Sequence, residues 1–238
     1  LAFCNIAAFH RFDPNNPSAS RFVDEDFNRV WSPDRLDGSK RSVELERARQ
    51  LRPIVDQADF LLDIHSMQNA TAPLMMCGPL EKGRRFAREI GMPRTVVSDE
   101  GHAAGRRMRD YGGFGEPNSP KNALLVECGQ HWEKSSEAVA KETAIRFLVS
   151  LDMVERSILS KYGYGPTGPQ QVIEVTDAVT ITADRFTFAS DYRGLEVLAK
   201  RGTVLGHDGT RPVVTPYDDC VLIMPSRRLT RGQTRSEE

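Results

Sequence analysis

The chain has 238 residues, of which 39% are hydrophobic and 27% charged, a composition typical of a globular protein with one large or two modest domains. Its formal net charge of -1 argues against a protein that binds nucleic acid or a membrane surface, because such proteins usually have an excess of basic residues. No apolar run approaches the roughly 20 residues of a transmembrane helix. The four cysteines are far apart and form no CxxC pair, so we expect no disulfide framework and a reducing, cytoplasmic location.

The first part of the chain predicts a strand and a helix. Residues 1–9 (LAFCNIAAF) have the pattern of a short buried strand that runs into a loop. This pattern begins without an initiator methionine or a signal-peptide pattern, so we expect the chain to lack its first elements. Residues 42–60 place apolar side chains at helical spacing, with Ser42 as the N-cap and Pro53 as an internal flaw. Glu44 and Glu46 fall in the first turn, where the helix dipole favours acids.

The middle of the chain alternates short apolar runs with helical patterns. Strands are predicted at 60–65, 74–77, 95–97 and 123–129, and helices at 81–90 and 135–161. This alternation indicates an α/β domain with a mainly parallel or mixed sheet and flanking helices. The glycine- and charge-rich residues 99–122 predict a long surface loop, and a loop of that length is more often functional than not.

A change in composition predicts a second domain. Residues 162–169 (YGYGPTGP) have the composition of a linker, so we expect a catalytic domain at 1–163 and a small all-β domain at 170–238. Gly202 and Gly206 are predicted turns of the second domain. Its predicted strands lie at 171–176, 178–182, 186–188, 195–198, 213–215 and 220–224.

The arginine stretch, residues 21–29 (RFVDEDFNR), is the first candidate site. It is too polar for a core strand and too irregular for a solvated helix face. Clustered guanidinium groups suit bidentate recognition of a carboxylate or phosphate. The alternative is a structural loop with internal ion pairs.

Two predicted strands end in ionisable side chains. Asp63 and His65 lie on one face of the strand predicted at 60–65, and Glu127 lies near the end of the apolar strand predicted at 123–129. Either could be structural, as an isolated histidine or an ion-paired glutamate. Together with the arginine stretch they suit metal-assisted hydrolysis, in which His65 holds zinc, Glu127 activates water and an arginine polarises the carbonyl. Asp63 could orient the imidazole.

Three segments carry a family resemblance. Residues 21–31 (RFVDEDFNRVW), 63–69 (DIHSMQN) and 126–130 (VECGQ) resemble, in order and spacing, the succinylglutamate desuccinylase/aspartoacylase family of zinc carboxypeptidase-like hydrolases. The likeness covers most of residues 1–160. It implies a zinc-carboxypeptidase-like mixed sheet with a β-rich C-terminal domain. It also implies a zinc-dependent hydrolase that cleaves the amide bond of a small N-acyl amino acid or a related amide.

The resemblance also implies roles for individual residues. His65 would be a zinc ligand, and Glu127 the general base and acid that moves a proton from water to the departing amine. Arg21 would stabilise the oxyanion of the tetrahedral intermediate. Asn28 and Arg29 would hold the α-carboxylate of the acylated amino acid.

The sequence departs from the family pattern in its metal ligands. No His-x-x-Glu pair precedes Arg21, and the upstream His10 is followed by Asp13 at the position of the glutamate. His10 and Asp13 could substitute for the pair, but they fall in the wrong place for the family. We therefore expect the first two zinc ligands upstream of Leu1, and expect the 238-residue chain to bind zinc poorly and to be inactive.

A second departure concerns the substrate. An arginine that aspartoacylase carries before its catalytic-glutamate strand is replaced here by residues 116–120 (EPNSP), which makes an N-acyl aspartate a doubtful substrate. Arg106, Arg107 and Arg109 either recognise another anionic group or form a solvated charge run. The alternative functions are a carboxypeptidase-like peptidase and a non-catalytic carboxylate-binding protein. A homo-oligomer is compatible with the sequence, which does not determine the oligomeric state.

Overall fold

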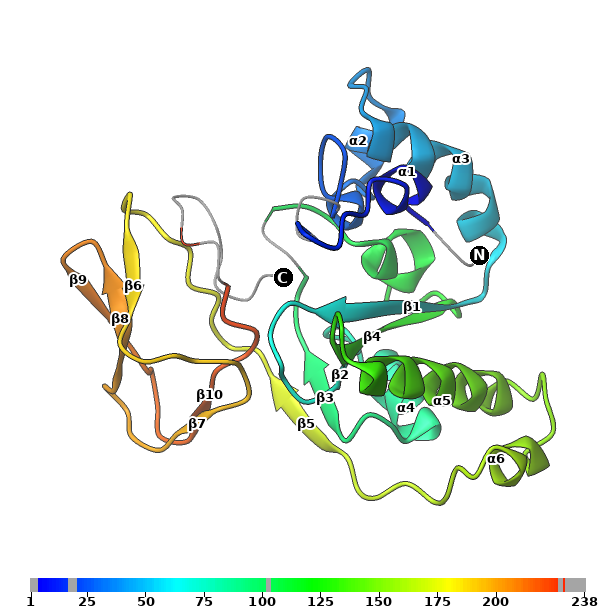
Figure 1. The fold of residues 1–238 in the computed structure, drawn as a ribbon. Helices are drawn as coiled ribbons and strands as arrows, with labels where there is room; N and C mark the ends of the chain where they lie inside the picture. Colours follow the sequence, from blue (N-terminus) through cyan, green and yellow to red (C-terminus); the bar gives the residue numbers. More distant parts are fainter. Residues whose placement is uncertain (1–3, 17–20, 102–103, 227–228, 230–238) are drawn as a thin grey trace. The chain divides into compact units, whose positions relative to one another are not determined.

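The computed structural model describes residues 4–16, 21–101, 104–226 and 229 (Figure 1). The chain divides into two compact units. The first comprises Leu1–Leu61 with Gly101–Ala123, and the second comprises Leu62–Glu100 with Leu124–Glu238.

The first unit contains helical segments, of which the longest has 15 residues. They are α1 (Ile6–Phe9), η2 (Phe27–Arg29), α2 (Pro33–Asp37), α3 (Val43–Gln57), η3 (Met108–Asp110) and η4 (Gly112–Phe114). The predicted helix is confirmed as α3, since the Ser42 side chain accepts the backbone N–H of Leu45 as an N-cap. Pro53 lies inside α3, which continues to Gln57.

The predicted strand at residues 1–9 is wrong where the structure describes it. Ile6–Phe9 form α1, because the side chain of Asn5 accepts the N–H of Ala8 and starts a helical turn. Residues 1–3 lie outside the described part of the chain. The local N-cap at Asn5 therefore decides the structure of this segment, and its apolar residues lie in a helical turn rather than in a strand.

The predicted surface loop at 99–122 is also wrong. Met108, Tyr111 and Phe114 are buried in the core of the first unit beside Trp31. Arg107 and Arg109 are not part of a solvated charge run either, because they are 4% and 2% exposed, whereas Arg106 is exposed. Both guanidinium groups contact the carboxylate of Asp110, and such pairing is what makes their burial tolerable.

The second unit contains a five-stranded sheet in the order β1-β4-β2-β3-β5. The strands are β1 (Phe60–Met67), β2 (Leu74–Met76), β3 (Thr95–Ser98), β4 (Asn122–Gln130) and β5 (Gln171–Glu174), with the first two residues of β1 and β4 assigned to the first unit. β2 pairs antiparallel with β4 and parallel with β3, and β3 pairs parallel with β5. The predicted α/β fold with a mixed sheet is confirmed.

The two neighbouring strands that carry predicted site residues run parallel. At their beginnings the N–H of Asn122 donates to the carbonyl oxygen of Asp59, and at their ends the N–H of His131 donates to that of Met67, both at 2.9 Å. The start of β4 is therefore bonded to the start of β1, and the end of β4 to the end of β1. The carboxyl ends of β1 and β4 lie at the same edge of the sheet.

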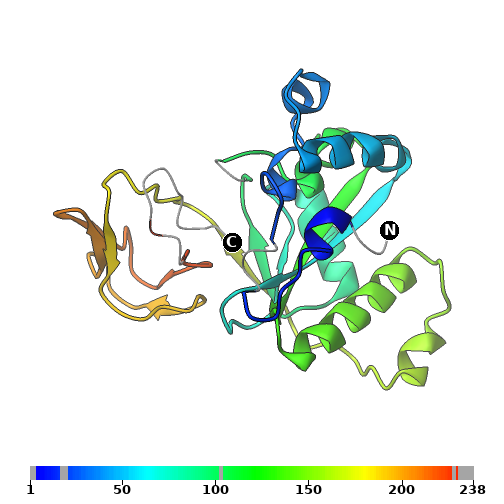
Figure 2. The same cartoon turned by 45° about the horizontal axis from the view of Figure 1, so that its top comes forward.

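Two helices, α4 (Glu81–Ile90) and α5 (Lys134–Ser150), cover one face of this sheet (Figures 1 and 2). Phe86 of α4 and Phe147 of α5 pack with ring centroids 5.6 Å apart above strand residues such as Val96. The predicted helix 81–90 is confirmed, and it ends at Gly91, which adopts the left-handed conformation.

The single helix predicted at 135–161 is wrong. The structure has α5 up to Ser150 and a separate α6 (Ser157–Lys161). Between them Asp152 adopts a positive φ of 53°, which an α-helix cannot contain. The apolar residues keep their helical spacing through this turn at Asp152, and for that reason the spacing alone predicts one continuous helix.

The C-terminal segment forms two small antiparallel sheets. Their strands are β6 (Phe186–Phe188), β7 (Val197–Leu198), β8 (Val204–Asp208), β9 (Arg211–Val214) and β10 (Cys220–Val221), in the orders β6-β8-β9 and β10-β7. Residues 178–182 form no strand. The predicted domain boundary near residue 170 stays a prediction, and β5 pairs with β3 of the large sheet.

The turn predicted at Gly206 is wrong, because this glycine lies inside β8. A side chain there would place its Cβ 2.5 Å from the carbonyl oxygen of Thr187 and 2.6 Å from the ring of Phe186. The glycine therefore permits close approach of β6 rather than a turn.

Among the described helices, none is long and apolar enough to cross a membrane.

Candidate functional site

The arginine stretch is an ordered segment of the first unit. Phe27 is buried in the core, where its ring meets that of Trp31 edge-on at 5.7 Å between centroids. Val30 forms an isolated parallel bridge with Arg106, and the N–H of Trp31 donates to the carbonyl oxygen of Arg106 at 3.1 Å. These contacts fix the backbone of the stretch against the segment that follows Gly105.

Arg21 pairs with an acid of its own segment. Its Nη2 lies 2.9 Å from Oδ2 of Asp26, and the side chains are 27% and 24% exposed. Burial alone would raise the pKa of Asp26, but the positive charges of Arg21 and Arg29 outweigh it and lower that pKa. The stretch thus contains an internal ion pair, as the structural interpretation predicts, and its role in binding stays a prediction.

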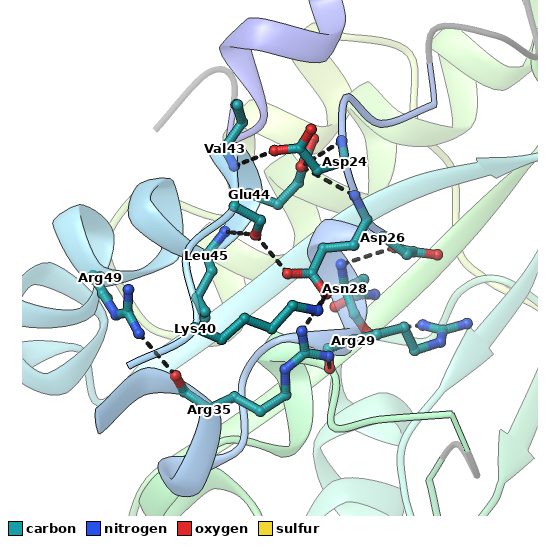
Figure 3. Close-up of polar contacts among 12 residues, drawn as sticks. Asp24, Asp26, Asn28, Arg29, Arg35, Lys40, Val43, Glu44, Leu45 and Arg49 are labelled. Atoms are coloured by element: carbon teal, nitrogen blue, oxygen red, sulfur yellow. Dashed lines mark hydrogen bonds and ion pairs between the residues drawn. The ribbon is translucent and has the colours of Figure 1, made fainter. Parts of the chain in front are cut away.

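Asn28 and Arg29 both contact backbone groups, and Figure 3 shows the two residues beside Asp26, whose carboxylate accepts the N–H of Asn28. Asn28 is 8% exposed, and its Oδ1 accepts the N–H of Met108 at 2.9 Å. This bond assigns the oxygen of the side-chain amide, so its NH₂ group is the part that can donate to a ligand. Arg29 donates through Nη1 to the carbonyl oxygen of Asn28 at 2.8 Å.

In the second unit, His65 and Glu127 lie on the same face of the sheet. Met67 of β1 and Leu125 of β4 belong to one core cluster, and side chains two residues apart on a strand share a face. His65 and Glu127 are each two residues from these core positions, on neighbouring strands. Their face is the one opposite the core of α4 and α5, which holds Val126 and Cys128.

The predicted contact between Asp63 and His65 is present. Nε2 of His65 lies 2.9 Å from Oδ1 of Asp63, whose side chain is 10% exposed. The second oxygen, Oδ2, is buried and has no hydrogen-bond partner in the described part of the chain. A buried carboxylate at this distance fixes the ring orientation of His65.

Glu127 is 4% exposed and lies opposite Leu74 of β2. Its charge also affects the next residue. Burial of the Cys128 thiol, and to a lesser extent the neighbouring carboxylate of Glu127, raises the pKa of Cys128 to about 12. Cys128 is therefore a neutral, unreactive thiol at neutral pH.

The structure groups the predicted residues in two sets. Arg21, Asn28 and Arg29 belong to the first unit, and His65 and Glu127 belong to the second. Sequence reasoning placed Glu44 only in the first turn of a helix, where the helix dipole favours an acid. In the structure Glu44 is fully buried and bonds to the backbone of the arginine stretch.

The zinc ion implied by the family resemblance can be tested against the side chains present. Over residues 4–16, 21–101, 104–226 and 229, no group of three or more histidine, cysteine, aspartate or glutamate side chains could hold a metal ion. Nε2 of His65 contacts the carboxylate of Asp63. Structural zinc sites use four protein ligands and catalytic sites three, so the described residues do not fit zinc by themselves.

Comparison with solved structures gives the fold a name. A succinylglutamate desuccinylase from Vibrio cholerae matches with a TM-score of 0.64 and 18% identity over 92% of this chain and 66% of that one. A succinylglutamate desuccinylase/aspartoacylase from Rhodobacter sphaeroides matches with a TM-score of 0.61 and 17% identity over 98% of this chain and 72% of that one. This chain has the desuccinylase/aspartoacylase fold.

A third match is the product-bound structure of the ectoine utilization protein EutE (DoeB) from Ruegeria pomeroyi, with a TM-score of 0.58 and 17% identity over 98% of this chain and 71% of that one. The predicted desuccinylase/aspartoacylase fold is therefore confirmed, and this chain spans about two thirds of the length of the first of these structures. No family model and no curated protein matches the chain.

Proposed function

We propose that the protein with this desuccinylase/aspartoacylase fold is a hydrolase that cleaves the amide bond of a small N-acyl amino acid or a related amide. The observation that carries the proposal is the placement of Glu127. It is a buried carboxylate on the same sheet face as His65, near the carboxyl ends of parallel neighbouring strands. Open α/β sheets keep their chemistry at that edge.

In the proposed reaction, Glu127 accepts a proton from the attacking water and delivers it to the departing amine. Its burial supports this role, because a low-polarity environment strengthens charge interactions with the reacting groups. Asp63 holds His65 at 2.9 Å and so positions the imidazole beside the same strand end.

Arg21, Asn28 and Arg29 carry the donors that we propose for the negatively charged parts of the substrate. Arg21 is proposed to stabilise the oxyanion, and its pairing with Asp26 limits the conformations of the guanidinium group. Asn28 offers the NH₂ of its side-chain amide, and Arg29 a guanidinium group, to the α-carboxylate. These roles rest on the sequence resemblance and on the chemistry of the side chains.

Zinc dependence stays a prediction of the resemblance. The steps above use only side chains, because the described residues do not form a complete zinc site. Metal analysis of the protein after purification with zinc tests this point directly. Stoichiometric zinc would support it, and a protein that hydrolyses amides without bound metal would contradict it.

Amine release by the full-length protein in the presence of zinc, measured with a panel of N-acyl amino acids beside a panel of dipeptides, tests the function. Glu127→Gln should lower turnover by about a thousandfold or more, while substrate still binds. The matched control is Glu155→Gln, an exposed glutamate between α5 and α6, which should leave turnover unchanged. Faster hydrolysis of dipeptides would favour a peptidase, and binding without hydrolysis would favour a carboxylate-binding protein.

A further inference from the structure

Glu44 is a fully buried carboxylate that bonds to the arginine stretch. It lies in the first turn of α3 and is 0% exposed. Its Oε1 accepts the N–H of Val23 at 2.6 Å and the Nδ2 of Asn5 at 3.2 Å. Its Oε2 accepts the N–H groups of Asp24 and Glu25 at 3.1 and 3.3 Å.

Three consecutive backbone N–H groups therefore converge on one side chain, as in a backbone nest for an anion. Burial alone would raise the pKa of Glu44, but the hydrogen bonds from Val23, Asp24 and Asn5 outweigh it and lower that pKa. The carboxylate is thus charged at neutral pH, when its hydrogen bonds are strongest.

The contact is reciprocal (Figure 3). Oδ2 of Asp24 accepts the N–H of Val43 at 2.8 Å, and Glu25 accepts a hydrogen bond from the hydroxyl of Ser42, the N-cap of α3. The stretch supplies acceptors to the start of the helix, and Glu44 of the helix supplies acceptors to the stretch. Each segment satisfies backbone donors that would otherwise lack a partner.

The anchored residues lie between the proposed functional groups of the stretch. Val23, Asp24 and Glu25 are preceded by Arg21 and followed by Asn28 and Arg29. The far end of the stretch is fixed separately, since Phe27 is buried in the core. Fixing the backbone at 23–25 therefore sets the spacing between Arg21 and the pair Asn28 and Arg29.

We propose that Glu44 is a positioning residue, which holds the backbone of the arginine stretch so that Arg21, Asn28 and Arg29 meet a carboxylate-bearing substrate in a fixed geometry. This inference rests on the proposed function. Preorganised donors avoid the entropic cost of ordering a loop when the substrate binds. A misplacement of about 1 Å by a residue away from the chemistry can cost about a hundredfold in rate.

Glu44→Gln tests the proposal, because it keeps the size of the side chain and replaces one acceptor by a donor that faces other donors. Amide hydrogen exchange at Val23, Asp24 and Glu25 should become at least about tenfold faster in the folded variant. The value of kcat/KM for an N-acyl amino acid should fall by about ten- to hundredfold, with KM rising. Glu46→Gln, on the same helix but with a 42% exposed side chain that pairs with Arg41 and Arg49, should change neither quantity.

A second variant covers the case in which Glu44→Gln does not fold. Glu44→Asp keeps the charge but is one methylene shorter, so it should show smaller changes of the same sign. Unchanged exchange at residues 23–25, or faster exchange with an unchanged kcat/KM, would overturn the positioning role. A wild-type protein that neither hydrolyses nor binds N-acyl amino acids would instead overturn the proposed function, whatever the exchange data show.

Discussion

Asn28 and Met108 are joined by a buried hydrogen bond, in which the N–H of Met108 donates to Oδ1 of Asn28 at 2.9 Å. The bond links the arginine stretch to a residue 80 positions later in the chain. It also fixes which end of the Asn28 amide faces away from Met108. The same side chain therefore contributes to stability through its oxygen and, in the proposed function, to binding through its nitrogen.

The two contributions of Asn28 can be separated by substitution. Asn28→Asp keeps an oxygen for Met108 but replaces the NH₂ donor by a carboxylate oxygen, which repels a substrate carboxylate. We expect KM to rise by about tenfold or more while stability changes little. Asn28→Ala leaves the N–H of Met108 buried without its acceptor and should lower the free energy of unfolding by about 1–3 kcal/mol, measured by urea titration. Equal stability of both variants would contradict this assignment.

Gly105 should not tolerate a side chain. Its φ is 149°, and a Cβ there would lie 2.3 Å from the carbonyl oxygen of Arg29. Gly105→Ala therefore combines backbone strain with a clash, and should lower the free energy of unfolding by about 2 kcal/mol or more. Gly112→Ala is the control, because Gly112 also has a positive φ of 52° but no atom within 4 Å of the added Cβ. It should cost only about 1–2 kcal/mol, and a larger loss at Gly112 would refute the role of the clash.

Glu25 should make the stability of the first unit depend on acidic pH. Its carboxylate accepts hydrogen bonds from Ser42, Arg35 and Lys40, which outweigh burial and lower its pKa from 4.5 to about 2. The folded state thus binds fewer protons than the unfolded state between these pH values. The stabilisation by Glu25 is complete above about pH 4.5 and is lost as the pH falls toward 2.

Thermal unfolding across this pH range checks the effect. Glu25→Gln should be less stable than the wild type at neutral pH, and the difference between the two should shrink as the pH falls toward 2. The exposed Glu155→Gln variant should follow the wild-type curve. A constant difference between Glu25→Gln and the wild type at every pH would show that titration of Glu25 is not responsible.

The cysteines should differ in their reactivity toward a thiol reagent. Cys77 and Cys128 are buried, and the pKa of Cys128 is raised to about 12, so both should react slowly in the folded protein at about pH 8. Cys4 and Cys220 are partly exposed and should react sooner. All four should react at once in denaturant. Mass spectrometry of the labelled peptides identifies the sites, and fast labelling of Cys128 before unfolding would contradict its burial.

The sequence alone determined the elements whose signals are local. The cap at Ser42 and the stop at Gly91 each predict a helix boundary from a few neighbouring residues, and the structure confirms both. The apolar runs at 60–65 and 123–129 predict strands, which the structure confirms as β1 and β4, each extending beyond its predicted range. Three short segments in order were also sufficient to predict the desuccinylase/aspartoacylase fold. The roles of Arg21, Asn28, Arg29, His65 and Glu127 stay predictions, since they concern a reaction.

Only the tertiary structure decided the features that depend on distant residues. Residues 99–122 are polar in sequence, yet Arg107 and Arg109 are buried, because both guanidinium groups pair with the carboxylate of Asp110. Tyr111 and Phe114 of the same segment are buried in a core that also contains residues of α3. Gly206 is of a residue type that favours turns, but it lies in strand β8, where the ring of Phe186 occupies the space that a side chain would need.

Glu44 is the clearest example of this division. Its sequence position predicts an acid in the first turn of a helix, favoured by the helix dipole. In the structure it is buried, because the N–H groups of Val23, Asp24 and Glu25, some 20 residues earlier, converge on its carboxylate. Helical periodicity cannot reveal such a partner, since the energy of burying a charge is decided by donors that only the folded chain brings within hydrogen-bonding distance.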